Sequence, residues 1–262
     1  MDRTSTEDTP RKERAGYILH DVLEMKKLLA RWVSRLLTID QKQQRVDDST
    51  AGLALLQRNR ANFFQRFVTM DEMWVHYHTP ESNRQSAEWL KSHESRPKRP
   101  KDQRSAEKVM ASVFWDAHGI IFIDYLQKGR TITGEYYATL LDKLNDEIKQ
   151  KRPHMVKKKV LYHHDNAPSH TSLKAMIKLD QLRFELVAHP PYSPDLAPSN
   201  YYLFPNLKRW LQGKRFTSNE EVIAETEAYF EGLDVSYYRK GIEMLENRYT
   251  KCIALEGNYV EE

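Results

Sequence analysis

Hydrophobic spacing divides the chain into a helical N-terminal part and a longer part in which strands and helices follow one another. Apolar residues recur every three or four positions over residues 17–37, which is the spacing of one helix face. A second pattern of this kind covers residues 41–67. We therefore expect a helical arm over residues 17–60, preceded by a polar, disordered tail over residues 1–16.

Five short segments rich in Val, Ile, Phe and Tyr follow, each bounded by Gly, Pro, Asn or Asp, as is typical of strands. They are residues 66–77, 109–115, 120–126, 159–163 and 184–189. Helical patterns over residues 134–150 and 172–182 lie among them, and further helices follow to the C-terminus. This order predicts an α/β domain over residues 61–262, with a mixed sheet flanked by helices and a helical C-terminal region.

Composition narrows the class of protein. Hydrophobic residues make up 40% of the 262 and charged residues 30%, as expected of a soluble globular chain with no membrane partner. The polar N-terminus has no apolar segment of the kind a secretory signal requires, so we expect an intracellular protein. The single cysteine, Cys252, excludes an internal disulfide and a thiolate zinc cluster. No pattern indicates a small-molecule cofactor, and a metal would need oxygen or imidazole ligands.

Basic side chains are concentrated in two segments, although the net charge is only +4. Residues 91–108 hold seven basic and three acidic side chains, and residues 149–159 hold six basic and none acidic. Such segments release counterions when they meet a phosphate backbone, which favours nonspecific DNA binding. The alternative is that they are solvated loops without a ligand. The candidate DNA contacts are Lys98, Arg99, Lys101, Arg104, Lys157 and Lys158.

Two aspartates follow apolar strand segments. Asp71 ends the run from Phe67, and Asp165 comes directly after residues 160–164. If the two strands are neighbours, the carboxylates repel one another and favour a shared hard cation, Mg²⁺ or Mn²⁺. The alternative is that each aspartate caps a turn. The histidines around Asp165 also suggest zinc, which we disfavour because no cysteine is available.

The sequence resembles the mariner family of DNA transposases over residues 17–260. The resemblance rests on WVSRLL (32–37), VTMDE (68–72), SAEW (86–89), HDNAPSH (164–170), the proline-rich residues 190–204 and GKRF (213–216), in this order. It implies an RNase H-like fold with three acidic residues that bind two divalent metals for DNA strand cleavage and strand transfer. By position, Asp71 is similar to the first acid and Asp165 to the second.

The third acidic position of the family falls on Asn200, 35 positions after Asp165. An amide oxygen can ligate a hard cation but brings no negative charge. We therefore expect weaker binding of the second metal and impaired cleavage, with the fold retained. Asp195 is a less favoured substitute, because the family places no metal ligand there.

The resemblance also shows departures near the N-terminus. About 16 residues precede it, so the family's helix-turn-helix region of roughly 100 residues, and with it recognition of the transposon ends, is expected to be missing. Ser34 stands where the family usually has a proline in a segment for subunit contacts, which weakens the expectation of a homodimer. We expect a truncated, impaired transposase that binds DNA nonspecifically in the nucleus. The alternative is a noncatalytic DNA-binding or scaffold protein.

Overall fold

In the computed structural model of the protein, the described residues are 14–26, 30, 33–82, 85–91, 94–95, 97–98 and 102–260. The chain divides into two compact units, Met1–Val33 and Ser34–Glu262, and each is described by itself. Among the described residues, no helix combines the length and the apolar character that crossing a bilayer demands.

The predicted helical arm forms only in part. Residues 14–17 are α-helical and continue into the short π-helix η1 (Ile18–Val22), whereas residues 23–26 and 34–38 are not helical. The apolar side chains of Tyr17, Val22 and Leu23 are exposed. A helix this short is marginal without a packed face, so the prediction of a helix throughout residues 17–37 is wrong for these parts. Residues 1–13 of the predicted tail lie outside the described residues.

The helix predicted over residues 41–67 is two helices. The first, α2 (Ile39–Arg58), begins at a capping box in which Thr38 and Gln41 each accept a hydrogen bond from the other's backbone N–H. Asn59 leaves helical geometry and its side chain accepts from the backbone N–H of Asn62, 2.9 Å away, which starts α3 (Arg60–Arg66). Asparagine is a strong N-cap residue, so it favours a new helix at this point.

The second unit is built around a five-stranded mixed sheet in the order β3-β2-β1-β4-β5. The strands are β1 (Phe67–His76), β2 (Lys108–Asp116), β3 (Gly119–Leu126), β4 (Leu161–His163) and β5 (Glu185–Leu186). The first three are antiparallel, and β4 and β5 run parallel to β1. The last strand is shorter than the predicted residues 184–189, because the chain turns into the proline-rich segment, where prolines lack the N–H that pairing requires.

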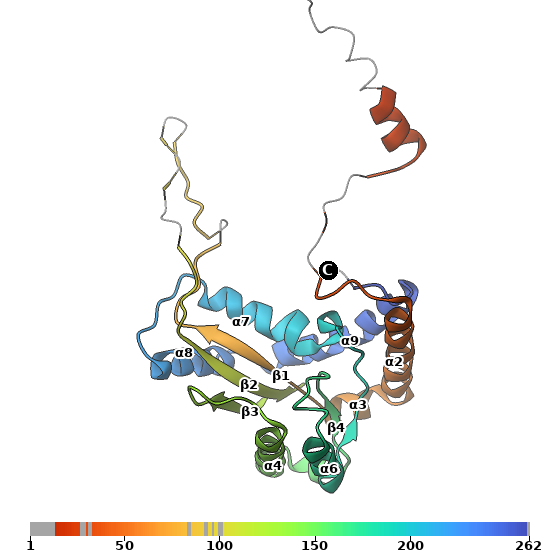
Figure 1. Ribbon diagram of the computed structural model, residues 1–262, viewed down its shortest axis with the longest axis vertical. Helices are drawn as coiled ribbons and strands as arrows, with labels where there is room; N and C mark the ends of the chain where they lie inside the picture. The colour runs from red at the N-terminus through yellow and green to blue at the C-terminus, as the bar shows by residue number, and fades with distance from the viewer. Residues whose placement is uncertain are drawn as a thin grey trace, which may run out of the picture. The chain divides into compact units, whose positions relative to one another are not determined.

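Helices cover both faces of the sheet (Figure 1), which confirms the predicted RNase H-like arrangement. One face carries α4 (Gly134–Lys151), α5 (Pro153–Val156) and α6 (Leu173–Gln181). The other carries η2 (Pro194–Leu196), η3 (Ser199–Leu203), α7 (Phe204–Leu211), α8 (Asn219–Glu231) and α9 (Val235–Ala254). Thr133 and Ser218 cap the starts of α4 and α8, where their side chains accept from backbone N–H groups.

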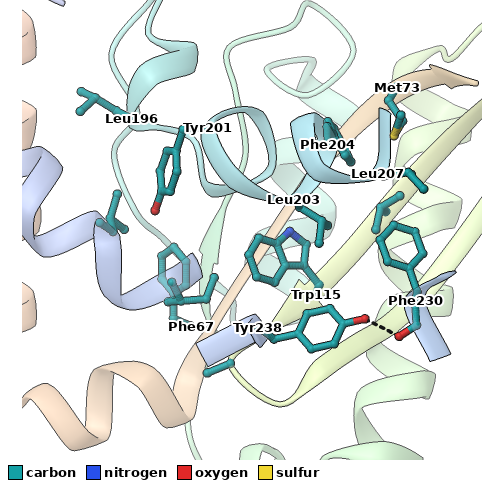
Figure 2. Close-up of a cluster of buried hydrophobic side chains, with 14 of the residues drawn as sticks. Phe67, Met73, Trp115, Leu196, Tyr201, Leu203, Phe204, Leu207, Phe230 and Tyr238 are labelled. Atoms are coloured by element: carbon teal, nitrogen blue, oxygen red, sulfur yellow. Dashed lines mark hydrogen bonds between the residues drawn. The ribbon is translucent and has the colours of Figure 1, made fainter. Parts of the chain in front are cut away.

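The larger core lies between the sheet and the helices that follow the proline-rich segment (Figure 2). Trp115 of β2 is fully buried at its centre, beside Leu203 and Tyr238. The Tyr238 hydroxyl donates to the Phe230 carbonyl at 2.7 Å, so the polar end of this buried ring is satisfied. An indole of this size is among the largest apolar contributions that one side chain makes to a core.

Candidate active site

Strand pairing brings the two predicted aspartates together. Thr69 of β1 pairs with His163 of the parallel strand β4, and the same register continued by two residues places Asp71 beside Asp165. The strands are therefore neighbours, as the cation hypothesis required. The Asp71 side chain is buried, while that of Asp165 is 43% exposed.

A buried histidine holds Asp165 in place. Oδ1 of Asp165 accepts from the backbone N–H of Ala167 at 3.0 Å and from Nδ1 of His170 at 2.7 Å. The opposite ring nitrogen of His170 lies 3.0 Å from Oε1 of Glu72, and its ring packs on Tyr137 with centroids 4.1 Å apart. Asp165 thus caps its own turn with one oxygen, and among the described residues Oδ2 has no hydrogen-bond partner.

The pKa values of this cluster reflect the crowding of carboxylates. Burial raises the pKa of Asp71 to about 7, together with repulsion from Asp165 and Glu72. Burial acts the same way on Asp165, but the hydrogen bonds from His170 and Ala167 and the charge of His170 together outweigh it and lower the pKa of Asp165 to about 2. For His170, burial is outweighed by the hydrogen bonds to Asp165 and Glu72, which raise its pKa to about 10. The imidazolium therefore donates to both carboxylates.

Asn200 completes the cluster from the face of the sheet opposite α4, α5 and α6. It lies in η3, and its Nδ2 donates to Oδ2 of Asp71, while Oδ1 of Asp71 accepts from the backbone N–H of Glu72 at 2.7 Å. The structure thus brings all three predicted positions together. It also gives Asp71 an amide donor where the resemblance implied a third carboxylate.

The charges fit one divalent cation better than two. Three carboxylates, those of Asp71, Glu72 and Asp165, face the single imidazolium of His170, so negative charge is in excess. A cation held by Asp71 and Asp165 would neutralise that excess. Within the described parts of the chain, no three His, Cys, Asp or Glu side chains form a ligand cluster, and a second cation would depend on the uncharged amide of Asn200.

A buried hydrogen bond anchors the segment that carries Asn200. The indole Nε1 of Trp115 donates to Oγ of Ser199 at 3.0 Å, and both residues are buried. Through this bond, β2, an interior strand of the sheet, fixes the start of η3 one residue before Asn200. A buried donor left without its partner costs about 1–3 kcal/mol.

We expect Ser199→Ala to lower the free energy of unfolding by about 1–3 kcal/mol, because the indole N–H then has no acceptor. Urea unfolding of Ser199→Ala, Trp115→Phe and the double variant measures the coupling between the two groups. A coupling energy of about 0.5 kcal/mol or more is expected for residues in contact. Strict additivity would show that the hydrogen bond contributes nothing.

The remaining histidines near Asp165 serve the core instead of a zinc site. His163 bonds to Oγ1 of Thr69 at 3.0 Å, and Nδ1 of His164 bonds to the Tyr137 hydroxyl at 2.8 Å. Burial lowers the pKa of His164 to about 3 and that of His163 well below its usual value. Both rings are therefore neutral hydrogen-bonding groups at physiological pH.

Asp195, the weighed substitute for the third acid, is engaged elsewhere. Both of its carboxylate oxygens accept from the guanidinium of Arg45, at 2.9 and 2.7 Å. The backbone N–H of Val260 donates to the same group at 2.8 Å. These contacts agree with the preference against Asp195 as a metal ligand, and they give it a structural role.

The predicted DNA contacts fall in two separate places. Arg104 is exposed. Burial lowers the pKa of Lys208 of α7, the charge of Arg104 adds to this effect, and the charge of Asp71 opposes it. Lys208 thus lies within electrostatic reach of both Arg104 and Asp71. Lys98 is exposed, whereas Arg99 and Lys101 lie outside the described residues. The other pair, Lys157 and Lys158, is exposed just before β4, at the end of the strand opposite Asp165.

Three neighbours of the site were not assigned roles from the sequence. Glu72 and His170 lie within the VTMDE and HDNAPSH runs, so their adjacency to Asp71 and Asp165 was the available signal. Lys208 has no such signal, because only the packing of α7 against the sheet brings it toward Asp71.

Comparisons with known proteins agree with this geometry. The family model described as "Transposase (partial DDE domain)" matches residues 79–158. The chain is 36% identical over 236 residues to the histone-lysine N-methyltransferase SETMAR of Homo sapiens, covering 90% of this chain and 34% of that protein. It is 34% identical over 235 residues to the mariner Mos1 transposase of Drosophila mauritiana, covering 89% and 67%.

The fold is also similar to a solved structure, the Mos1 mariner paired end complex with Mn. The TM-score is 0.82 at 31% sequence identity, and the match covers 99% of this chain and 77% of that one. The chain thus spans about a third of SETMAR and two thirds of Mos1.

Proposed function

The chain belongs to the mariner family of DNA transposases, and from this premise we propose that it carries out metal-dependent cleavage and transfer of DNA strands. The observation that carries the proposal is the closeness of Asp71 on β1 to Asp165, two residues beyond the end of β4, which follows from the Thr69–His163 register and the mutual repulsion of the two carboxylates. Excess negative charge at that point favours a divalent cation, and Arg104 and Lys208 nearby favour a phosphate backbone.

The cation is Mg²⁺ or Mn²⁺, held by Asp71 and Asp165. The Mos1 structure is a complex with Mn, which supports a metal of this kind. The chemistry that such a cation supplies when bound is Lewis acidity toward the scissile phosphate and an attacking water. His170 holds Oδ1 of Asp165 at 2.7 Å, which leaves Oδ2 as the ligand atom. Arg104 and Lys208 hold the DNA backbone over the carboxylates.

Cleavage is impaired by Asn200. Two-metal hydrolysis needs one cation for the attacking oxygen and another for the leaving oxygen. With an amide at the third position, the second cation loses a charged ligand. The Asn200 side chain is moreover turned with its Nδ2 toward Asp71, so its oxygen has to be reoriented before it can serve as a ligand.

The partners in this proposal are DNA, bound without strong sequence preference, and a second copy of the chain. The Mos1 paired end complex supports both. A protein that acts on chromosomal DNA functions in the nucleus. The basic run at residues 96–101 is suited to serve as its nuclear localisation signal.

Supercoiled plasmid nicking in the presence of Mn²⁺ tests the proposal. We expect slow nicking by the wild type and none by Asp71→Ala, because the cation loses one of its two carboxylates. Asp71→Ala should keep its fold and its DNA affinity, since burial beside Asp165 and Glu72 makes this charge unfavourable without metal. Asp180→Ala, which removes an exposed carboxylate in the last turn of α6, is the matched control and should behave as wild type.

A second candidate function is a noncatalytic DNA-binding scaffold. It is favoured by one observation, the hydrogen bond from Asn200 to Asp71, which satisfies the buried carboxylate without a cation. The same assay separates the two functions. Equal background nicking by wild type and Asp71→Ala, with DNA still bound, would support the scaffold over the enzyme.

A further inference from the structure

A cavity of about 300 Å³ lies at the end of β4 opposite Asp165. Its walls come from the last turns of α4, from α5 and the residues that lead into β4, and from the turn after α6. These helices cover one face of the sheet (Figure 1). We call this cavity the lysine pocket. Its floor is apolar, with Ile148, Met155 and Val160 buried there.

The rim of the lysine pocket is cationic. Five basic side chains and no carboxylate line it: Lys149, Lys157, Lys158, Lys159 and Arg183. Lys149 pairs with Asp146 at 2.8 Å, and Lys158 donates to Gln65 at 3.2 Å. Within the described residues, the side chains of Lys157, Lys159 and Arg183 form no ion pair. Three unpaired like charges around one cavity repel one another, and an anion between them removes that cost.

Arg183 occupies an unusual backbone position for an arginine. It has a φ of 57° in the turn that ends α6, where Phe184 donates back to the Leu179 carbonyl at 3.0 Å. Glycine is the usual residue at such a helix end, because it has no Cβ to clash. Arg183 therefore strains the backbone of this turn, and it adds a cation to the rim of the pocket.

We propose that the lysine pocket binds the phosphate backbone of DNA, as a site separate from the carboxylate cluster. The proposal rests on the proposed function for the identity of the anion. An apolar floor below a cationic rim suits a nucleotide unit, whose sugar and base are less polar than its phosphate. The residues of the pocket alone suit either a free anion or a DNA phosphate. The distance from the lysine pocket to the carboxylate cluster favours DNA.

That distance matches a strand of DNA. From Lys159 to Asp165 the chain advances six residues, through β4 and the residues on either side of it, and spans at most roughly 20 Å at about 3.3 Å per residue. Each strand of duplex DNA carries one phosphate per about 3.4 Å of helix axis, so about six base pairs span the gap. A DNA segment engaged at Asp71 and Asp165 is therefore long enough to place a phosphate in the lysine pocket.

A purely structural role for these cations makes a different prediction. Three helices, α4, α5 and α6, end near the pocket, and basic side chains stabilise the negative ends of helices. On that basis, neutralising Lys157 and Lys159 lowers the melting temperature and leaves DNA affinity unchanged.

Fluorescence anisotropy with a labelled duplex of random sequence tests the proposal on the full chain in EDTA, over a series of salt concentrations. For Lys157→Gln/Lys159→Gln we expect the dissociation constant to rise by roughly fivefold to tenfold per lysine at about 0.1 M salt, and the slope of log K against log salt to fall by about 1 per contact. The matched control is Lys240→Gln/Lys251→Gln on α9, on the other face of the sheet, which should leave both quantities unchanged.

Arg183→Gly separates binding from folding. Glycine relieves the positive φ, so we expect a higher melting temperature together with weaker DNA binding. Unchanged affinity and salt slope in the pocket variants, with wild type still binding DNA, would overturn the lysine pocket alone. Failure of the wild type to bind DNA would overturn the proposed function as well. Because metal is absent throughout, the outcome does not depend on cleavage.

Discussion

Replacing Asn200 with aspartate is expected to raise Mn²⁺-dependent nicking of supercoiled plasmid by roughly 10²-fold or more, because a charged ligand for the second cation contributes several kcal/mol to the transition state. The new carboxylate takes the place of an amide that already contacts Asp71, so it lies within reach of the cluster. The initial rate of open-circle formation by equal amounts of each protein measures the effect.

The same substitution should leave a signature in stability. Without metal, Asn200→Asp replaces a hydrogen bond to Asp71 with repulsion between two carboxylates, so the melting temperature in EDTA should fall below that of wild type. Added Mn²⁺ should raise it more than it raises wild type, because a cation that binds the folded state stabilises it.

Asn200→Ala is the control for the loss of the hydrogen bond alone. It should show neither the gain in nicking nor the enlarged response to Mn²⁺. Asn200→Asp protein that melts normally but nicks no faster than wild type would contradict the assignment of position 200 to the metal site.

The second large effect is expected from Arg45→Ala, which should lower the free energy of unfolding by about 3–5 kcal/mol. Arg45 is completely buried in α2. Besides Asp195, its guanidinium donates to Oγ of Ser193 at 2.6 Å and to the carbonyl of Gly257 at 2.8 Å. Its removal leaves the Asp195 carboxylate and these acceptors without their donor in the interior.

Urea unfolding followed by circular dichroism measures this loss. A domain's total stability is about 5–15 kcal/mol, so the midpoint should shift strongly. Arg60→Ala is the matched control, because Arg60 is half exposed and its ion pair with Glu246 lies on the surface. It should cost about 1 kcal/mol or less. An equal loss of unfolding free energy in the two variants would show that the buried contacts of Arg45 stabilise the fold no more than a surface ion pair does.

Local patterns were sufficient for most of the secondary structure. Strands β1, β2 and β3 and helix α4 lie within a residue or two of their predicted bounds, because alternation and helical spacing are properties of neighbouring residues. The predictions were wrong where context outweighed pattern. Asn59 divides one predicted helix by capping the next, and residues 23–26 lack helical structure despite apolar spacing.

For the site, the sequence indicated the three positions, and the fold determined what surrounds them. The closeness of Asp71 to Asp165 followed from strand order once β1 and β4 were neighbours. The bridge from Asp165 through His170 to Glu72 could not be read from spacing, because it depends on how the loop after β4 folds back over β1.

The sequence by itself determined the elements, the α/β class and the identity of the residues at the candidate metal positions, including the amide at position 200, because these depend on side-chain type and local periodicity. Only the tertiary structure decided that Asp195 pairs with Arg45, 150 residues away in the chain, and that Lys157, Lys159 and Arg183 surround one cavity. Contacts of this kind form when packing brings distant segments together, and no local pattern records which segments meet.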